Sequence, residues 1–483
     1  MYSESADCTI ESNLIAVAGD VTVDWMVFVP EVAAPEVLQT TYQWEQRDTA
    51  RILAMPGGAA LATILIRSAM NHVRSGNSDN VSGPSVSRAP LTDPSDDSLT
   101  RTYTTWQPIP LRTGDPTLVW RMNRFLGVQP GTQSASSASN NSGFPRCLVI
   151  DDANLGFRNL EDSWPSCLGS NQPPLHVILK MSNPLVSGPL WNQLTEHHVD
   201  QLTVYCSVDD LRKEYAPIGQ ALSWERTAYD VTMAVRSHAD LQQARWVIVS
   251  VGMSGALIVE RDGPATLIYD PLYQEGDWES ERPGNPIGLG TCVAAGLALQ
   301  ANDCPEEPDW VLATSRGLRA ARTLHERRLV RPDDDHRDEA HFPLADTAAE
   351  LMNSEISPFQ CVRVSEDDDW TVLGSNYGDA AILAEQLVVR QDAIDEIDLP
   401  IERIGAWSSI DRTEIESMRS VRNIIREYLQ QPRLSRPLSL AVFGPPGSGK
   451  SFAIKQMARQ WGKDHCGDED RVSLVLSLRI SQE

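Results

Sequence analysis

Short hydrophobic runs alternate with amphipathic stretches over the middle of the chain, from residue 147 to residue 257. The runs are bounded by polar residues and rich in β-branched side chains, which predicts buried strands. One stretch between them, residues 223–235, has the apolar spacing of a helix. The predicted strands are Cys147–Ile150, His176–Met181, Leu202–Cys206 and Trp246–Val251. This alternation favours an α/β fold with a mainly parallel sheet.

The N-terminal region has a similar pattern and adds a pair of glycines. Residues 14–29 form an apolar run broken by Gly19-Asp20, as in a buried strand that leads into a loop. Further on, Met55-Pro56-Gly57-Gly58 opens a helical segment. The two glycines either allow the backbone to approach a ligand closely or form a helix-entry turn. Residues 102–127 alternate apolar and polar positions, which predicts edge strands.

Two glycine-rich turns follow in the second half of this region. The first, at residues 252–257, includes Gly252 and Gly255 and comes directly after a predicted strand. The second, Gly288-Leu289-Gly290, runs into a helix of small residues. A helix start of this kind presents backbone N–H groups and the positive end of the helix dipole to an anion. The second turn is therefore a candidate anion-binding site.

The most specific motif lies near the end of the chain. The apolar run Leu438–Phe443 leads into a phosphate-loop pattern, G-x-x-x-x-G-K-[ST], and then into a helix-like pattern. Glycines in such a loop let backbone N–H groups wrap a polyphosphate. Lys450 would reach the β- and γ-phosphates and the Ser451 hydroxyl would bind Mg²⁺, so ATP and Mg²⁺ are the expected ligands. The predicted nucleotide-binding residues are Gly444, Pro445, Pro446, Gly447, Ser448, Gly449, Lys450, Ser451 and Phe452.

The order of the motifs in residues 14–325 resembles the ribokinase/PfkB family of sugar and nucleoside kinases. The resemblance implies a ribokinase-like three-layer α/β sandwich with a small β lid, formed here by residues 25–50 and 101–126. It also implies that Asp24 and the paired glycines line a sugar or nucleoside site, and that the late glycine turn holds the transferring phosphoryl group. The motifs are Gly19-Asp20 with Asp24, Gly57-Gly58, Asp151-Asp152, Gly252 to Leu257 with Gly255, and Gly288-x-Gly290.

The chain departs from this family at the position of the catalytic base. The family pattern is Gly-Ala-Gly-Asp, whereas this chain has Gly288-Leu289-Gly290-Thr291. A threonine cannot accept a proton from a substrate hydroxyl near neutral pH, and general-base catalysis is typically worth about 10²–10⁴-fold in rate. We therefore expect a kinase fold kept as a binding or sensing domain. The alternative is an active kinase that transfers the γ-phosphate of ATP to a sugar or nucleoside hydroxyl through another base.

Residues 411–483 resemble the beginning of an AAA-type P-loop ATPase domain. Asp411-Arg412-Thr413-Glu414 has the form of a capping box, which predicts a helix start, and residues 471–478 predict a second strand. A Walker B carboxylate, a water-positioning residue and an arginine finger cannot be located after Lys450. Asp338-Glu339-Ala340-His341 has the form of a Walker B tetrapeptide, but no apolar strand precedes it, and we interpret it as a coincidence.

Three hypotheses follow from these motifs, and they leave open whether the chain is an enzyme. The favoured one is the N-terminal part of a P-loop ATPase that carries a sugar-kinase-like sensor and could form oligomers through a complete AAA-like domain. The second is an active PfkB-type kinase with a nucleotide-binding tail. The third is an ATP-binding scaffold without catalysis.

Composition narrows the expected partners and compartment. The sequence has 41 Lys and Arg against 66 Asp and Glu, a net charge of −25. Such an acidic surface repels phosphate backbones and anionic lipid, so neither nucleic acid nor a membrane is expected as a partner. The eight cysteines include no C-x-x-C pair, and the N-terminus has no basic region leading into an apolar stretch. Both features predict a cytoplasmic protein.

The predicted domain organisation has a kinase-like region, an acidic connection and a phosphate-loop unit. Ser- and Asn-rich stretches cannot bury a core, so they predict flexible insertions within the first region. The expected boundaries are a disordered segment at 1–13, a kinase-like domain at 14–325 with insertions near 72–100 and 130–144, an acidic linker at 326–400 and the phosphate-loop unit at 401–483.

Overall fold

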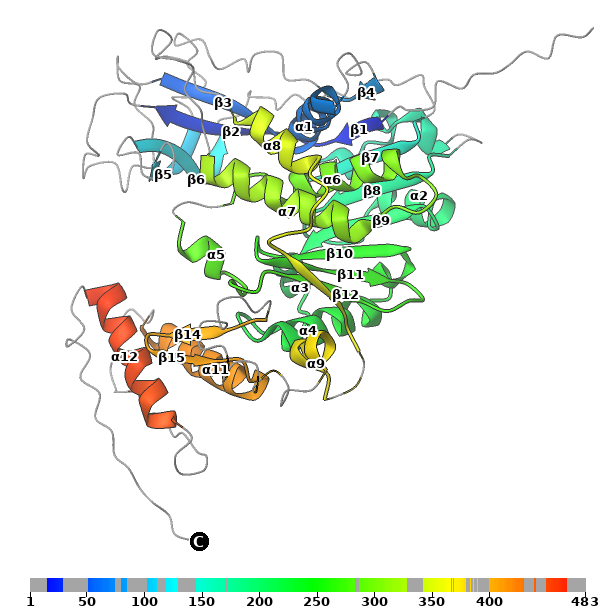
Figure 1. Cartoon of the computed structure of the whole chain (residues 1–483). Coiled ribbons are helices and arrows are strands. Elements are labelled where there is room, and N and C mark those ends of the chain that lie inside the picture. Colours follow the sequence, from blue (N-terminus) through cyan, green and yellow to red (C-terminus); the bar gives the residue numbers. More distant parts are fainter. Residues whose placement is uncertain are drawn as a thin grey trace, which may run out of the picture. The chain divides into compact units, whose positions relative to one another are not determined.

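The computed structural model describes two compact units of the chain (Figure 1). Unit 1 comprises the described residues within 1–218, 230–269 and 275–364, and unit 2 those within 219–229, 270–274 and 365–483. Within these residues, side chains are described except at 23–28, 51–55, 73, 102–110, 118–128, 429, 450 and 460–466. The described residues are 15–28, 51–73, 80–84, 102–110, 118–128, 145–169, 173–282, 286–327, 342–365, 367, 369–378, 383, 385, 389, 399–429, 438–439 and 449–466.

A nine-stranded sheet forms the centre of the described part of unit 1, in the order β13-β12-β11-β10-β9-β8-β7-β1-β4. Neighbours are parallel from β4 to β10 and antiparallel from β10 to β13. The predicted α/β class with a mainly parallel sheet is confirmed. The strands are β1 (Ile15–Gly19), β4 (Val81–Ser82), β7 (Cys147–Asp152), β8 (His176–Met181), β9 (Leu202–Ser207), β10 (Trp246–Val251), β11 (Gly255–Glu260), β12 (Thr266–Tyr269) and β13 (Gln360–Arg363).

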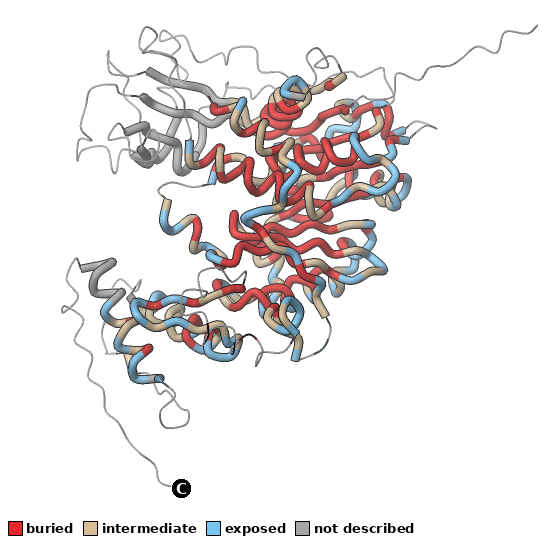
Figure 2. Tube along the Cα trace, in the orientation of Figure 1, coloured by how far each residue is buried: buried red, intermediate tan, exposed pale blue. Residues whose placement is uncertain are grey.

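Helices cover this sheet and bury its apolar strands (Figure 2). α6 packs on β7, β8 and β9 and is lined by α1 and α7, while α3 contacts β9 and β10. α6 and α7 can approach closely because Gly296 has no side chain: a Cβ at this position would lie 2.5 Å from the carbonyl oxygen of Ala313. The helices are α1 (Gly58–Val73), α2 (Pro189–His197), α3 (Val208–Lys213), α4 (Trp224–Ser237), α5 (Asp277–Ser280), α6 (Leu289–Asp303), α7 (Trp310–Arg327) and α8 (Leu344–Leu351).

A second, antiparallel sheet of unit 1 has the order β3-β2-β6-β5. Its strands are β2 (Val21–Phe28), β3 (Arg51–Gly57), β5 (Thr102–Pro110) and β6 (Leu118–Val128). β5 and β6 match the strands predicted over residues 102–127, whereas residues 29–50 lie outside the described part. Met55-Pro56-Gly57 was expected to open a helix, but these residues end β3 because they pair with Thr22–Asp24, and α1 begins at Gly58.

Residues 342–363 differ from the irregular linker expected there. They form α8 and β13, and β13 is an edge strand of the large sheet. Arginines of α7 hold this segment: Arg316 Nε donates to Asn353 O at 2.6 Å, and Arg319 Nη1 donates to Ser357 O at 2.8 Å. The acidic composition of the surrounding sequence predicted a linker. The contacts that order residues 342–363 join α7 to main-chain carbonyls distant in sequence, so no local pattern contains them.

Unit 2 contains α9 (Val372–Tyr377), β14 (Glu402–Ile404), β15 (Trp407–Ser409), α11 (Arg412–Leu429) and α12 (Lys450–Cys466). A small core of Ile404, Met418, Ala453 and Met457 joins the hairpin to α11 and α12. The predicted N-cap is present, because Asp411 Oδ1 accepts from the N–H of Glu414 at 2.9 Å. The Glu414 carboxylate accepts instead from Ser409 Oγ, at 2.6 Å. No helix in the described part of either unit is long and apolar enough to cross a membrane.

Candidate functional site

A cavity of about 360 Å³ lies in unit 1 beside the first turns of α1 and α6. It is lined by Thr22, Pro56, Gly57, Gly58, Leu61, Lys180, Ile287, Gly288, Leu289, Gly290, Thr291 and Phe342. The structure thus brings together the glycine pair at the junction of β3 and α1, the late glycine turn and Thr291, all of which were singled out from the sequence. Lys180, Leu61 and Phe342 were not predicted.

The topology of the large sheet favours this cavity as a ligand site. After β1 the chain adds β4 on one side of β1, and β7 later pairs on its other side. In open parallel sheets, ligands bind outside the carboxyl ends of the strands where the strand order reverses in this way. Lys180 lies near the carboxyl end of β8, so the cavity is at that edge of the sheet.

The start of α6 requires glycine at two positions. Gly288 is the N-cap and has φ 61°, a left-handed conformation that favours glycine. A Cβ at Gly290 would lie 2.6 Å from Cε1 of Tyr205 and 2.8 Å from Cε of Lys180. The first helical bond runs from Cys292 N to Gly288 O at 2.8 Å, so the preceding N–H groups have no acceptor within the helix. The backbone here can donate to a ligand.

A buried carboxylate lies beneath this turn. Asp151, at 1% exposure, accepts from Lys180 Nζ at 2.6 Å and contacts Thr291 Oγ1 at 3.4 Å, with Thr291 as the donor. Burial raises the pKa of Asp151, and the ammonium group of Lys180 opposes that shift. Thr291 stands where the family resemblance places an aspartate, and the Asp151 carboxylate lies behind two residues of the cavity wall, Thr291 and Lys180.

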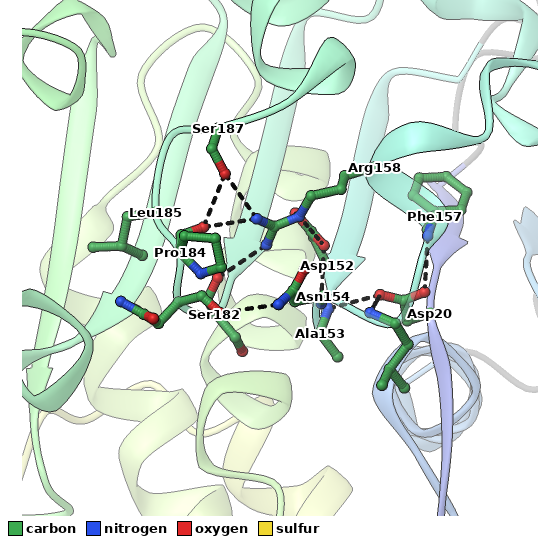
Figure 3. Close-up of polar contacts among 12 residues, drawn as sticks. Asp20, Asp152, Ala153, Asn154, Phe157, Arg158, Ser182, Pro184, Leu185 and Ser187 are labelled. Atoms are coloured by element: carbon green, nitrogen blue, oxygen red, sulfur yellow. Dashed lines mark hydrogen bonds and ion pairs between the residues drawn. The ribbon is translucent and has the colours of Figure 1, made fainter. Parts of the chain in front are cut away.

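A network of hydrogen bonds fixes the loop that follows β7 (Figure 3). The Asp20 carboxylate accepts from the N–H groups of Ala153, Leu155 and Phe157 at 3.0, 3.0 and 3.1 Å. Arg158 Nε donates to Asp152 at 3.0 Å, and its Nη1 donates to Pro184 O at 2.7 Å. Asp20 and Asp152, singled out as a motif, do not line the cavity; they hold the loop between β7 and β8 in place.

The turn at Gly252 and Gly255 also lies outside the cavity lining. Glu279 of α5 fills it, since Glu279 Oε1 accepts from Met253 N at 2.5 Å. Arg322 Nε donates to Met253 O at 2.9 Å, so both backbone polar groups of Met253 have side-chain partners. Burial raises the pKa of Glu279. Asp24, the predicted sugar-binding residue, belongs to β2, and its side chain is outside the described part.

The phosphate loop is described only at its end. Residues 444–448 lie outside the described part, and so does the side chain of Lys450. Gly449 has φ 74°, and α12 begins at the next residue, with Ala453 N donating to Gly449 O at 2.9 Å. Ser451 and Phe452 are exposed. Among the described residues, no group of three or more His, Cys, Asp or Glu side chains could hold a metal ion.

Sequence patterns could have identified one of the missed residues. Lys180 is a cation inside the otherwise apolar strand His176–Met181, and a buried cation usually has a partner. Phe342 has no such signal, because it lies far along the chain from the other lining residues.

No protein-family profile and no curated protein matches this sequence. Solved structures that match are ribokinase/PfkB-family kinases over much of the chain. Phosphofructokinase-2 from Escherichia coli in complex with fructose-6-phosphate is 13% identical, covers 70% of this chain and 98% of its own, and has a TM-score of 0.37. Ribokinase from Cryptococcus neoformans var. grubii serotype A in complex with ADP is 15% identical, with coverages of 70% and 99% and a TM-score of 0.35.

Pyridoxal kinase from Staphylococcus aureus in complex with AMP-PCP and pyridoxal covers less of the chain. It is 11% identical, spans 46% of this chain and 74% of its own, and has a TM-score of 0.30. These identities and TM-scores are too low to assign the chain to a family.

Proposed function

We propose that the chain is an ATP-binding protein whose unit 1 binds a small organic ligand without catalysing its phosphorylation efficiently. ATP with Mg²⁺ binds the phosphate loop of residues 444–452, within an AAA-like unit, and the ligand of unit 1 binds the cavity at α6. The observation that carries the proposal is the start of α12 at Lys450, directly after a left-handed glycine.

The start of α12 suits a polyphosphate. The first N–H groups of a helix have no helical acceptor and favour an anion, and a glycine-rich loop before them can wrap it. The Ser451 hydroxyl is exposed at this point, where Mg²⁺ would be held next to the phosphates. Phe452, the next residue, is exposed as well.

The chemistry of the cavity supports binding more than transfer. The Asp151 carboxylate is almost completely buried and is paired with Lys180, so it does not touch the cavity itself. Thr291 occupies the position where direct proton abstraction would need a carboxylate. We therefore assign unit 1 the role of a ligand sensor, and we assign the binding of ATP to the phosphate loop.

Calorimetric titration of Mg²⁺-ATP into the chain and its Lys450→Ala variant tests the nucleotide site. We expect one site in the wild type and at least a hundredfold loss of affinity in the variant. Lys455→Ala is the matched control, because Lys455 is exposed on the same helix five residues later. Unchanged ATP binding in Lys450→Ala would show that the nucleotide binds elsewhere and would overturn the proposal.

One observation favours a second function, phosphoryl transfer from ATP to a hydroxyl group. Thr291 Oγ1 lies 3.4 Å from Asp151 Oδ2, so a substrate proton could pass to the threonine oxygen while the threonine proton passes to the carboxylate. The substrate oxygen would then bond to the γ-phosphorus as the bond to the ADP oxygen breaks. ADP release that depends on an added alcohol and disappears in Thr291→Val would support this alternative.

A further inference from the structure

We propose that unit 1 has a second binding site, at the amino end of β10, which takes an α-amino acid with an aliphatic side chain. The site is a cavity of about 310 Å³, a volume at the lower end for small-molecule sites. It shares no lining residue with the cavity at α6, so the proposal goes beyond the proposed function and does not depend on it. The lining residues are Val235, Arg236, Gln242, Ala244, Val247, Val259, Glu260, Arg261 and Asp262.

The floor of this cavity is aliphatic and comes from both strands of a hairpin and from the chain beside it. Val247 of β10 pairs directly with Val259 of β11, so these two side chains lie together on one face of the sheet. Val235 belongs to the last turn of α4, and Ala244 lies just before β10. All four side chains are buried. Hydrocarbon placed against them gains dispersion contacts and gives up no hydrogen bond.

The rim of the cavity brings a carboxylate and a guanidinium group to one glycine. Gly263 leaves room for Glu260, since a Cβ at Gly263 would lie 2.1 Å from Glu260 Oε2. Arg236 Nη2 donates to the carbonyl oxygen of the same glycine at 2.9 Å. Because both side chains line the cavity, its wall carries a negative and a positive group close together.

The Glu260 carboxylate is available to a ligand, whereas the other charges of the rim are compensated. Arg261 Nη2 donates to Asp200 Oδ1 at 2.7 Å, and Arg261 Nε lies 3.6 Å from Asp262 Oδ2. Arg261 Nη1 donates to Gln243 O at 3.0 Å. In the part of the chain that the structure describes, the Glu260 carboxylate makes no hydrogen bond or ion pair. A cationic group in the cavity would give it one.

These groups match the two charged ends of an α-amino acid. The ammonium group and the carboxylate of such a ligand are joined through one carbon, as two neighbouring groups of opposite charge on the wall require. The ammonium group donates to Glu260, and the ligand carboxylate accepts from the guanidinium of Arg236, which has five N–H donors. The ligand side chain leaves from the same carbon and covers the aliphatic floor. A plain amine or a plain carboxylic acid uses only one of the two rim groups.

Ligand-observed NMR titrations of the full chain test this proposal with leucine and three analogues. 4-Methylpentanoate lacks the ammonium group of leucine, 3-methylbutylamine lacks its carboxylate, and alanine lacks most of its side chain. We expect leucine to bind at least tenfold more tightly than each analogue, because each one loses a charge-assisted hydrogen bond or the contact with the floor.

Two variants assign the rim groups to the two ends of the ligand. Glu260→Gln should weaken leucine at least tenfold and leave 4-methylpentanoate unchanged, since that probe has no ammonium group. Arg236→Met should weaken leucine to a similar extent and leave 3-methylbutylamine unchanged, since that probe has no carboxylate. Glu196→Gln is the control, because Glu196 is 74% exposed and is not part of the cavity wall.

The outcomes separate this site from the proposed function. Absence of leucine binding at millimolar concentrations would overturn the proposal, and so would equally tight binding of the analogues that carry one charge. Leucine binding that Thr291→Val abolishes and Glu260→Gln leaves unchanged would place the amino acid in the cavity at α6 and overturn the second site. None of these results bears on the loss of ATP binding expected in Lys450→Ala. The comparison of probes on the wild-type chain decides even if a variant does not fold.

Discussion

Among the described helices, α6 and α12 each begin directly after a left-handed glycine, and their surroundings differ. α6 starts after Gly288, and its first turn borders a cavity whose wall also includes Lys180 and Phe342. α12 starts after Gly449, and Ser451 and Phe452 in its first turn are exposed. In both cases the glycine before the helix has a left-handed conformation. The same local pattern thus borders a cavity in unit 1, whereas in unit 2 it is followed by two exposed side chains.

The difference lies in which parts of the chain reach each helix start. At α6, strands distant in sequence supply a buried carboxylate, a lysine and a tyrosine ring, so the site is assembled by the sheet. At α12, the described contacts come from the small hairpin and from α11: Ala453 and Met457 pack with Ile404 and Met418, and farther along the helix Gln456 Oε1 accepts from Ala406 N at 3.3 Å. We therefore expect substitutions at α6 to change stability, and those at α12 to change nucleotide binding with little effect on stability.

The largest effect is expected when Lys180 is replaced by methionine. Removing one member of a buried ion pair leaves the other charge unpaired and lowers the free energy of unfolding. We expect a loss of about 3 kcal/mol, the lower end of the usual range, because Lys180 is 16% exposed. Lys450→Met, at the start of α12, should change stability by less than about 0.5 kcal/mol. Urea denaturation, with hydrogen exchange in β7 and β8 identifying the transition of unit 1, measures the difference.

A second substitution tests the cause of that loss. Asp151→Asn removes the charge that Lys180 balances, so the double variant with Lys180→Met should recover part of the lost stability. If the double variant is as unstable as the sum of the two single variants, the ion pair does not couple these residues.

Alanine at the two glycine turns should destabilise the chain to different extents. At Gly290 the new Cβ would meet the ring of Tyr205, which is buried and hydrogen-bonded to Ser250 at 2.7 Å, and overpacking of this kind costs about 2 kcal/mol. At Gly449 nothing lies within 4 Å, so the cost is only the left-handed backbone, about 1 kcal/mol. The unfolding temperatures of the two variants measure the difference. Equal decreases in unfolding temperature would contradict the close packing of Tyr205 against Gly290.

The buried carboxylate makes the stability of unit 1 depend on pH. Burial raises the pKa of Asp151 above its ordinary value of 3.8, so the folded state holds this proton more tightly than the unfolded state. The stabilisation that this raised pKa gives to the folded state is fully present below the ordinary pKa. It is lost as the pH rises through the pKa of the folded state, and the free energy of unfolding falls by at most about 1.4 kcal/mol per pH unit. Denaturation curves from acid to neutral pH should show this slope in the wild type and a smaller one in Asp151→Asn.

A surface variant provides the reference for this experiment. Asp262 is 92% exposed, so Asp262→Asn should keep the pH dependence of the wild type. A slope that survives in Asp151→Asn would assign the pH dependence to other buried carboxyl groups, among them Glu279, whose pKa is also raised by burial.

Local patterns predicted the strands and several site residues, but not their neighbours. The strand periodicity of residues 147–251 predicted β7, β8, β9 and β10 because buried parallel strands are apolar along their whole length. The glycine turn before Thr291 predicted the start of α6 because few other residues adopt its left-handed conformation. The contact of Asp151 with Lys180 joins neighbouring strands, and no pattern within one segment contains it. Phe342 reaches the cavity from residues whose composition predicted only a linker.

The smallest effect on stability is expected for Ser451→Ala, because Ser451 is exposed in the first turn of α12. The change should stay within about 0.5 kcal/mol, as for other exposed positions. Its effect on ATP should be larger and should depend on the metal: we expect about tenfold weaker binding with Mg²⁺ and little change in EDTA, since the hydroxyl is assigned to the metal and not to the phosphates. Threonine at this position keeps the hydroxyl and should restore binding. An equal loss with and without Mg²⁺ would instead show that Ser451 acts on the nucleotide or on the helix start, and the site at α12 would then not be a magnesium–nucleotide site of the kind proposed.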